Sequence, residues 1–246
     1  MTLTGPAGAG AAAMVFVDDP TAPRVAADDA HHLLDVLRLR PGELVVAGDG
    51  RGRWTTCRIA GPDGRDRPAG DDLLIPEGDV RVDPPADPPI TVAFAPVKGD
   101  RPEWVVQKLT ELGVDRIVPL VTARSVVRWD GERSARVVPR LRRIAREASA
   151  QCRRAHLPEI TEVTTLDGLV TVASGLVTLA QPGGGPPTLD CTTVAVGPEG
   201  GWDPAELAAT GSTTGLGSTV LRAETAAVSV AALLCGLRAG VVGPPG

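Results

Sequence analysis

The sequence predicts an α/β protein in two parts, a small β module followed by a larger domain built on a parallel sheet. Three observations support this prediction. Strand-like and helix-like segments alternate after residue 90, a proline-rich run separates two regions of different texture, and short apolar alternations broken by turns precede that run. Alternation of strands and helices favours a parallel sheet covered by helices on both faces.

Composition limits the classes of protein to which the chain can belong. Of 246 residues, 43% are hydrophobic but only 2% are aromatic, so the core must be mainly aliphatic. No apolar run approaches the roughly 18 residues of a membrane helix, and the N-terminus lacks the features of a secretory signal. We therefore expect a cytoplasmic protein without a membrane partner. The scattered Cys and His residues match no zinc spacing, so no metal is expected.

The chain divides, on these grounds, into four predicted segments. Residues 1–13 are rich in Gly and Ala and should be disordered, and Met14 is an alternative to Met1 as the translation start. Residues 14–82 should form the β module. Residues 83–89 (DPPADPP) are a proline linker, because such a run builds neither a helix nor a central strand. Residues 90–246 form the larger domain.

Within the β module, one helix and one hairpin can be assigned. Apolar side chains between His31 and Leu39 are sufficient for a short helix. Residues 44–46 resemble a strand, and Gly48-Asp49-Gly50 after them suits a hairpin turn. Residues 54–59 would then be the returning strand.

The larger domain carries the segments of a parallel sheet. Five apolar strands are predicted, at residues 90–95, 116–121, 176–180, 193–196 and 219–221.

Three helices are predicted among these strands. The first spans Glu103 to Leu112, with Pro102 in its first turn and Gly113 at its end. The last runs from about Glu224 to Arg238. The middle helix is predicted from a set of apolar residues that would lie on one helical face: Leu141, Ile144, Ala145, Ala148 and Cys152. Pro139 either fits the first turn of this helix or kinks it.

Basic residues are clustered, although the net charge is −5. That average argues against a generally basic nucleic-acid binder, but residues 124–154 contain ten Arg and only three acidic residues. Arginines in such a cluster can bind phosphate groups. The candidate RNA contacts are Arg38, Arg40, Arg51 and Arg53 in the β module, and Arg124, Arg143, Arg146, Arg153 and Arg154 in the cluster.

Three predicted strands end in segments that suit a ligand, because ligands of parallel sheets sit at the carboxyl ends of the strands. These segments are Leu179-Ala180-Gln181-Pro182, Gly197-Pro198-Glu199-Gly200-Gly201 and residues 216–226. Their glycines let a backbone approach a ligand closely. None is a phosphate loop or a dinucleotide fingerprint, and a tight turn is the alternative interpretation of the glycine-rich segment.

Taken together, the segments indicate a particular protein family more specifically than any one of them does. The larger domain resembles the SPOUT superfamily of S-adenosylmethionine-dependent RNA methyltransferases, and within it the bacterial family that methylates N3 of a uridine in 16S ribosomal RNA. The resemblance covers residues 14–240. It rests on QKLTELGV at 107–114, ARSV at 123–126, REASAQCRR at 146–154, GPEGG at 197–201 and LRAETA at 221–226. Ala123 and Cys152 depart from the residues common in the family, outside the cofactor motifs.

The resemblance implies a fold, a cofactor and partners. The larger domain would contain a trefoil knot, and the β module would be a PUA-like barrel. The family works as a homodimer on 16S ribosomal RNA, within the small ribosomal subunit. S-adenosylmethionine would be held by Leu179, Ala180, Gln181, Gly197, Pro198, Glu199, Gly200, Gly201, Leu216, Gly217, Leu221, Arg222, Thr225 and Ala226.

Methylation of N3 requires that its proton leave, because the lone pair of N3 becomes available only then. Glu199 and Glu224 are candidate bases, although each could instead support the glycine loop or a helix end. Arg222, Arg154 and Arg124 are candidates to stabilise the uracil anion, and Arg222 is favoured.

Two other functions remain open at this stage. A SPOUT ribose 2′-O-methyltransferase would usually carry Ser-Leu-Asn where this chain has RAET at 222–225. A non-catalytic RNA-binding protein would not need the GPEGG and LRAETA segments.

Overall fold

The structure, a computed structural model, describes residues 5–61, 72–97, 101–127, 129, 131–173 and 176–243. The chain forms two compact units. Unit 1 comprises Met1–Pro85 with Arg146–Leu157, and unit 2 comprises Ala86–Ala145 with Pro158–Gly246. The predicted limits at 14–82 and 90–246 stay a prediction; the compact units differ from them in that residues 146–157 group with the N-terminal unit.

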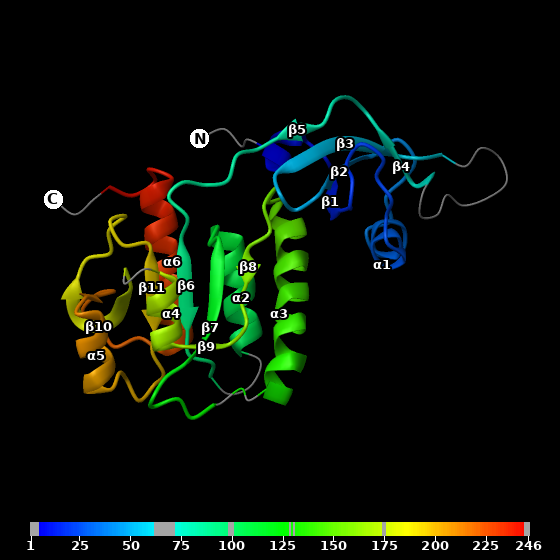
Figure 1. The fold of residues 1–246 in the computed structure, drawn as a ribbon. Coiled ribbons are helices and arrows are strands. Elements are labelled where there is room, and N and C mark those ends of the chain that lie inside the picture. Colours follow the sequence, from blue (N-terminus) through cyan, green and yellow to red (C-terminus); the bar gives the residue numbers. More distant parts are fainter. Residues whose placement is uncertain are drawn as a thin grey trace. The chain divides into compact units, whose positions relative to one another are not determined.

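Unit 1 is built on a five-stranded sheet in the order β1-β2-β3-β4, with β5 also paired to β3 (Figure 1). β1 and β2 are parallel, and the other pairs are antiparallel. β2 and β3 are the predicted hairpin, with Gly48 opposite Trp54 at its closed end. The strands are Ala13–Phe16 (β1), Leu44–Gly48 (β2), Arg53–Ile59 (β3), Leu74–Pro76 (β4) and Arg81–Val82 (β5).

The predicted helix at 31–39 lies earlier in the chain than expected. It begins as α1, Ala27–His31, and continues as a π-type turn, η2, over His32–Val36. Leu33 is fully buried from this segment. The helix ends before Arg38, whose φ of 55° lies in the left-handed region. The apolar spacing correctly included the buried Leu33, but it did not predict where the helix begins. The first turn carries Asp28 and Asp29, whose negative charges suit the N-terminal end of the helix dipole.

The prediction that residues 1–13 are disordered is wrong for residues 5–13; residues 1–4 lie outside the described residues. A 3-10 helix, η1, covers Gly5–Ala9, and β1 begins at Ala13. Ala11 is buried, and the Ala12 N–H donates to the Leu44 carbonyl at 2.8 Å. Small side chains allow this close packing, so the composition that suggested disorder serves here to cover the sheet.

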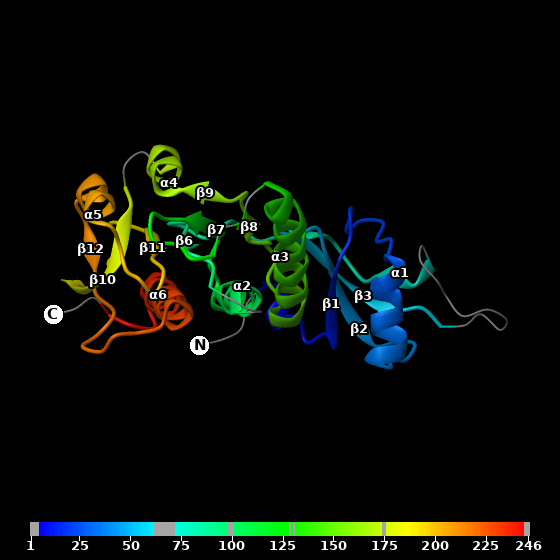
Figure 2. The ribbon, with the colours of Figure 1, turned by 90° about the horizontal axis from the view of Figure 1, so that it is seen from below.

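Unit 2 contains the predicted parallel sheet, in the order β12-β10-β11-β6-β7-β8 (Figure 2). Every pair along this order is parallel, and β9 adds a further parallel pair with β7. The strands are Thr91–Phe94 (β6), Arg116–Val121 (β7), Glu159–Ile160 (β8), Thr164–Thr165 (β9), Thr178–Gly185 (β10), Thr193–Val196 (β11) and Thr213–Thr214 (β12).

Helices cover both faces of this sheet, as predicted. Figure 2 shows α2 and α6 on one face and α4 and α5 on the other. The helices are Arg101–Leu112 (α2), Gly131–Cys152 (α3), Leu166–Val172 (α4), Pro204–Thr210 (α5) and Ala223–Arg238 (α6). α3 begins well before the predicted apolar face, so Pro139 lies inside the helix and not in its first turn. No helix among the described residues is long and apolar enough to cross a membrane.

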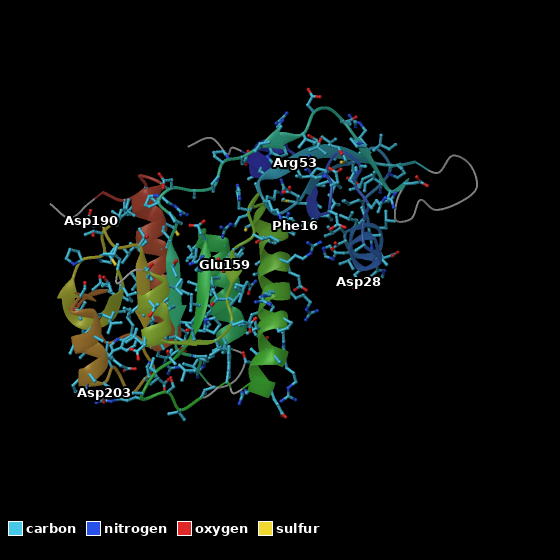
Figure 3. The ribbon with its side chains drawn as sticks, viewed as in Figure 1. Phe16, Asp28, Arg53, Glu159, Asp190 and Asp203 are labelled. Carbon is cyan, nitrogen blue, oxygen red and sulfur yellow. The ribbon has the colours of Figure 1, made fainter. Side chains whose placement is uncertain are left out.

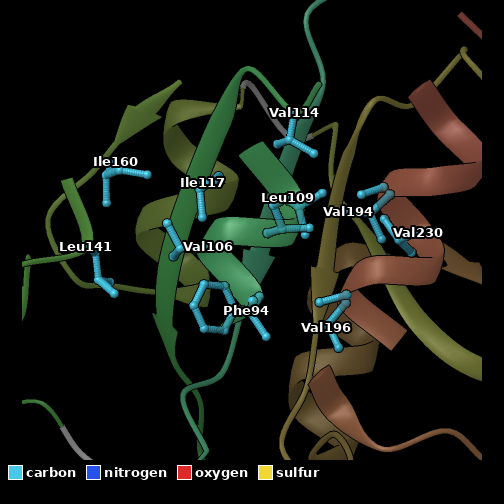
Figure 4. Close-up of a cluster of buried hydrophobic side chains, with 14 of the residues drawn as sticks. Phe94, Val106, Leu109, Val114, Ile117, Leu141, Ile160, Val194, Val196 and Val230 are labelled. Atoms are coloured by element: carbon cyan, nitrogen blue, oxygen red, sulfur yellow. The ribbon is translucent and has the colours of Figure 1, made fainter. Parts of the chain in front are cut away.

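Alternate residues of β6 enter different halves of the core, as the two-residue period of a strand requires. Val92 and Phe94 pack in the cluster that includes Leu109 of α2 and Val230 of α6 (Figure 4). Ala93 faces the opposite cluster, which includes Leu179 and Trp202. The sheet is therefore buried on both faces by side chains of the packed helices.

The predicted strand at 219–221 is wrong. Residues 215–222 form a loop, and the edge strand is instead β12. Val220 is 87% exposed, so its apolar side chain does not join the core. A three-residue apolar run lacks the length to distinguish a buried strand from a loop that faces a cavity.

Removal of residues 1–12 should lower the free energy of unfolding by about 2 kcal/mol, because it uncovers the core at Ala11 and removes the bond from the Ala12 N–H. Urea denaturation measures the effect, with a chain that lacks only residues 1–4 as the reference. Equal stability of the two truncated chains would show that residues 5–12 contribute nothing to unit 1.

Candidate functional site

A cavity opens in unit 2 where β10 and β11 separate. Ala180 and Val196 form the last paired positions of these strands, and both line the cavity. On its other edge β10 pairs with β12 from Leu179 onward, with an irregular register between Ala180 and Gly185. The other lining residues are Gln181, Pro182, Gly197, Pro198, Glu199, Gly201, Trp202, Leu216, Gly217, Thr219, Val220, Leu221, Ala223 and Ala226.

The loop after β11 forms one wall of this cavity. The Gly201 N–H donates to the Pro198 carbonyl at 2.9 Å, and Gly201 has a φ of 69°, which glycine adopts without strain. Gly197 lies against the indole of Trp202, so that a Cβ atom at Gly197 would stand 2.9 Å from the ring. The loop is therefore a close-packed turn with little room for larger side chains at Gly197.

Trp202 connects this wall to β10. Its indole N–H donates to the Ala180 carbonyl at 2.9 Å, and its ring is buried. α5 begins directly afterwards with Asp203 as its N-cap, and the Asp203 side chain accepts a hydrogen bond from the Ala205 N–H (Figure 3). Glu206 completes the capping box and also accepts the Ala123 N–H at 2.8 Å. The loop is thus anchored at its end by a buried aromatic ring and a capped helix.

Another wall of the first cavity comes from the loop after β12 and the first turn of α6. Gly217 has a φ of 127°, a conformation that other residues rarely adopt, and it lines the cavity. Leu216 and Leu221 add apolar side chains, and Ala223 and Ala226 present the small side chains of α6. The wall is apolar, and its backbone lies close to the open space.

A second cavity adjoins the first, and Pro198 and Glu199 line both. It lies between the segments that follow β6 and β11 and is also lined by Pro96, Val97, Arg101, Val126, Val127 and Gly200. Of the described residues that line either cavity, Arg101 alone is basic.

Arg101 stands between two carboxylates. Its Nη1 lies 3.4 Å from Glu224 Oε1 and 3.8 Å from Glu199 Oε1. Glu199 is 67% exposed at its side chain, whereas Glu224 is only 13% exposed, and Glu224 Oε2 is buried without a hydrogen bond to any described residue. Two of the three predicted catalytic residues, Glu199 and Glu224, therefore share one cation that sequence analysis did not single out.

Most residues predicted to hold the cofactor line the first cavity. Four do not: Leu179, Gly200, Arg222 and Thr225. Leu179 is fully buried in the core, because it lies one residue before the strands separate. Gly200 lines the second cavity instead. Arg222 and Thr225 are exposed, Arg222 as the residue before α6.

Six lining residues are absent from the individual residues predicted to hold the cofactor; Val196 and Trp202 lie outside the predicted ligand segments, whereas Pro182, Thr219, Val220 and Ala223 lie within them. A signal was available for Trp202, since it is one of four Trp in the chain and directly follows the glycine-rich segment. Thr219 and Val220 belong to the predicted ligand segment at 216–226, although they were also assigned to a strand.

Several arginines of the predicted RNA-binding cluster are engaged within the protein. The Arg146 guanidinium donates to the Phe16 carbonyl at 2.8 Å, contacts Asp29 and stacks on the Phe16 ring at 5.1 Å in unit 1 (Figure 3). Arg153 donates to the Ala12 carbonyl, and Arg124 donates to the Gly200 carbonyl at 3.2 Å. Arg146 and Arg124 therefore have structural partners that their clustering in the sequence did not reveal.

The arginines of the β module are more open. Arg38, Arg40, Arg51 and Arg53 are exposed, and Arg53 forms an exposed ion pair with Asp19 at 3.7 Å. In the cluster, Arg143 is exposed and Arg154 is half-buried.

The first cavity has the chemistry for a ligand that is partly apolar and not anionic. Backbone, small and apolar side chains form its walls, Glu199 is its one acidic residue, and its described lining contains no basic residue. The second cavity differs because its apolar walls carry one guanidinium. The two together can hold a cationic donor next to an acceptor that becomes negatively charged.

Comparison with known families identifies both parts of the chain. Residues 84–235 match the RNA methyltransferase domain family, and residues 25–67 match the RNA methyltransferase PUA domain family. The ribosomal RNA small subunit methyltransferase E of Mycobacterium bovis is 36% identical over 227 residues, which cover 81% of this chain and 80% of the relative. The protein of the same name from Bacillus subtilis is 26% identical, over 82% of this chain and 85% of the relative.

Solved structures have the same fold. A probable rRNA-methyltransferase from Porphyromonas gingivalis matches with a TM-score of 0.77 and 26% identity, over 94% of this chain and all of the other. A putative methyltransferase from Legionella pneumophila, solved with bound S-adenosylmethionine, matches with a TM-score of 0.74 and 28% identity, over 89% and 94% of the two chains.

The substitution Gly197→Ala should lower the free energy of unfolding by about 1–3 kcal/mol, because the new methyl group meets the Trp202 ring in a closely packed wall. Gly200→Ala is the matched control. A Cβ atom there would lie 3.6 Å from the Arg124 Cβ, an ordinary contact, and its effect should stay below about 0.5 kcal/mol. Urea denaturation of both variants tests the geometry of the loop, which equal losses of stability would contradict.

Proposed function

We propose that this chain, which belongs to the RNA methyltransferase family, transfers a methyl group from S-adenosylmethionine to N3 of a uridine in 16S ribosomal RNA. The observation that carries the proposal is the cavity at the carboxyl end of β11, beside β10, which is lined by glycine, other small residues and apolar side chains. Ligands of open parallel sheets bind at this position.

The residues of this cavity fit the proposed cofactor. S-adenosylmethionine supplies an electrophilic methyl group on a positively charged sulfonium. Leu216, Leu221 and Ala226 offer apolar surface for an adenine ring, and the loop at Gly197 offers backbone groups for hydrogen bonds. The Glu199 carboxylate and the lack of basic residues in the described lining favour a cationic ligand. The chain's main task at this site is to position and desolvate the donor.

Ribosomal RNA of the small subunit is the proposed substrate. The names of the mycobacterial and Bacillus relatives support it, as does the match of residues 25–67 to a PUA domain of RNA methyltransferases. The choice of N3 of uridine rests on the family resemblance of the sequence motifs. RAET at 222–225 supports base methylation over ribose methylation, because ribose enzymes usually have Ser-Leu-Asn there.

A homodimer that acts in the cytoplasm, on RNA within the small subunit, completes the proposal. The family resemblance supports the dimer. Val220 at the rim of the first cavity and Val126 at the rim of the second are 87% and 79% exposed, and a second chain would shield them from water. Light scattering of the purified protein measures its mass in solution, and a monomeric mass would contradict the dimer.

Methyl transfer is tested with small ribosomal subunits that lack the modification, and the methylated atom is mapped by mass spectrometry. Gly217→Ala should weaken S-adenosylmethionine binding at least tenfold in calorimetry, because it strains the cavity wall at a φ of 127°. Gly211→Ala is the matched control, since it strains the end of α5 at a φ of 63° outside the described lining. Equal affinities of the two variants would remove the loop at Gly217 from the cofactor site.

RNA affinity should fall steeply with salt, and exposed arginines of the β module should carry part of that dependence. Arg38→Gln together with Arg51→Gln should reduce the slope of log K against log salt by about 0.7–0.9 for each phosphate that is no longer neutralised. Arg146→Gln should instead lower stability and leave the slope unchanged, because its guanidinium is bound to Phe16 and Asp29. If Arg146→Gln lowered the slope and the double variant of Arg38 and Arg51 did not, the RNA would instead contact the arginine cluster at residues 124–154.

A further inference from the structure

The second cavity lies where an acceptor for the proposed donor must be. Pro198 and Glu199 line both cavities, so groups held in the two cavities would lie on either side of this turn. Methyl transfer requires that the acceptor atom approach the donor along a line within a small distance. The second cavity is a space next to the first from which a base could make this approach.

The walls of the second cavity suit a planar, partly apolar ring. Pro96 and Val97 continue the chain after β6, and Val126 and Val127 approach from the segment after β7. The volume of the cavity is about 330 Å³, within the usual range of small-molecule sites. Apolar side chains on two sides can hold the faces of a pyrimidine, while its polar edge turns toward the charged residue.

Arg101 is that residue, and its position leaves its donors available. Its side chain is 43% exposed and lines the cavity from the first turn of α2. The distances of 3.4 and 3.8 Å to Glu224 and Glu199 exceed the roughly 2.7–2.9 Å of a charge-assisted hydrogen bond. The carboxylates therefore attract the guanidinium without occupying its N–H groups, and no described residue forms a hydrogen bond with them.

Glu224 holds Arg101 in place from the other side. It belongs to the first turn of α6, where the helix dipole favours a carboxylate, and it is mostly buried. A mostly buried carboxylate is stabilised by a cation beside it, so Arg101 and Glu224 fix each other. The buried Glu224 Oε2 has no hydrogen-bond partner among the described residues, so the described part of the chain does not satisfy every polar group of this pair.

We propose, on the basis of the proposed function, that the cavity between β6 and β11 holds the acceptor uracil and that Arg101 is the catalytic residue that stabilises its anion. N3 loses its proton to water, and the electron pair left on N3 forms the new bond to the methyl carbon. The carbon–sulfur bond breaks at the same time, and its electron pair stays on sulfur as a neutral thioether. A planar guanidinium matches an anion delocalised over N3 and the two flanking oxygens.

The proposal moves the anion-stabilising role away from the arginines that the sequence favoured. Arg222 is exposed and lines neither cavity, and Arg124 is bound to the loop carbonyl of Gly200. Arg154 is not among the described residues that line either cavity. Arg101 is the one arginine among the described lining residues that combines a place in the acceptor cavity with a buried carboxylate behind it.

The experiment measures single-turnover methylation of small subunits by Arg101→Gln across a range of pH, with calorimetry of S-adenosylmethionine alongside. The rate should fall by about 10²–10³ at neutral pH, as for loss of one stabilising donor, while cofactor affinity changes less than about threefold. The deficit should shrink as pH rises, because more of the uracil is already anionic. RNA that carries 5-fluorouridine, whose N3 is more acidic, should reduce the deficit at least tenfold.

Three further variants separate this role from a structural one. Arg116 begins β7, whereas the second cavity lies beyond the other end of this strand. Arg116→Gln removes a charge from the exposed ion pair of Arg116 with Glu159 and should leave the rate and its pH profile unchanged. Arg101→Lys keeps the charge and should retain more activity than Arg101→Gln. Glu224→Gln, a change in a positioning residue, should produce a smaller deficit with the same dependence on pH and on 5-fluorouridine.

Each outcome has a distinct meaning. A deficit in Arg101→Gln that is equal at every pH and with both RNAs would overturn the role of Arg101, as would a rate within about threefold of the unaltered chain. If Arg101→Gln fails to fold, the comparison of Arg101→Lys and Glu224→Gln on the two RNAs decides in the same way. Lack of N3 methylation by the unaltered chain would overturn the proposed function itself.

Discussion

The parallel pairing of β6 with β11 is the constraint on which the functional end of unit 2 depends. It aligns Thr91 with Thr193 and Phe94 with Val196, so strands about a hundred residues apart end side by side. β11 also pairs with β10 on its other edge, and the loop that follows β11 is therefore placed between two strand ends. One cavity lies on the β10 side of this loop and the other on the β6 side. A single register thus determines where both ligands can sit.

The cluster of arginines illustrates how composition and structure can point to different uses of the same residues. α3 is one helix, but its last turns belong to unit 1, where Arg146 and Arg153 bind carbonyl groups of the N-terminal segment. The Arg146 guanidinium donates to a part-buried carbonyl, contacts Asp29 and stacks on the Phe16 ring, so it contributes to stability through several contacts at once. Phosphate binding would require these bonds to break. The exposed Arg38, Arg40 and Arg51 of the β module could bind phosphate without breaking bonds of this kind.

Much of the fold could be predicted from the sequence, because long apolar segments have a clear period. β7 matches its predicted limits, β11 does so as well, and α6 differs by one residue. The errors concern short or atypical segments: residues 5–13 looked too simple in composition to be ordered, and residues 219–221 looked like a strand. Local sequence cannot reveal which backbone groups a distant segment will satisfy. The trefoil knot and the domain limits stay predictions.

The sequence predicted the first cavity but not the charged residue of the second cavity. Glycine-rich turns after strands are visible in a sequence, and they located the first cavity. The cation of the second cavity is not visible, because Arg101 is an ordinary first-turn residue until α6 brings Glu224 to it across the end of the sheet. A basic residue in the donor cavity would repel a sulfonium, whereas an anionic acceptor requires one within a few ångströms. The placement of the charge on one side of the Pro198–Glu199 wall satisfies both requirements, and only the folded topology can produce it.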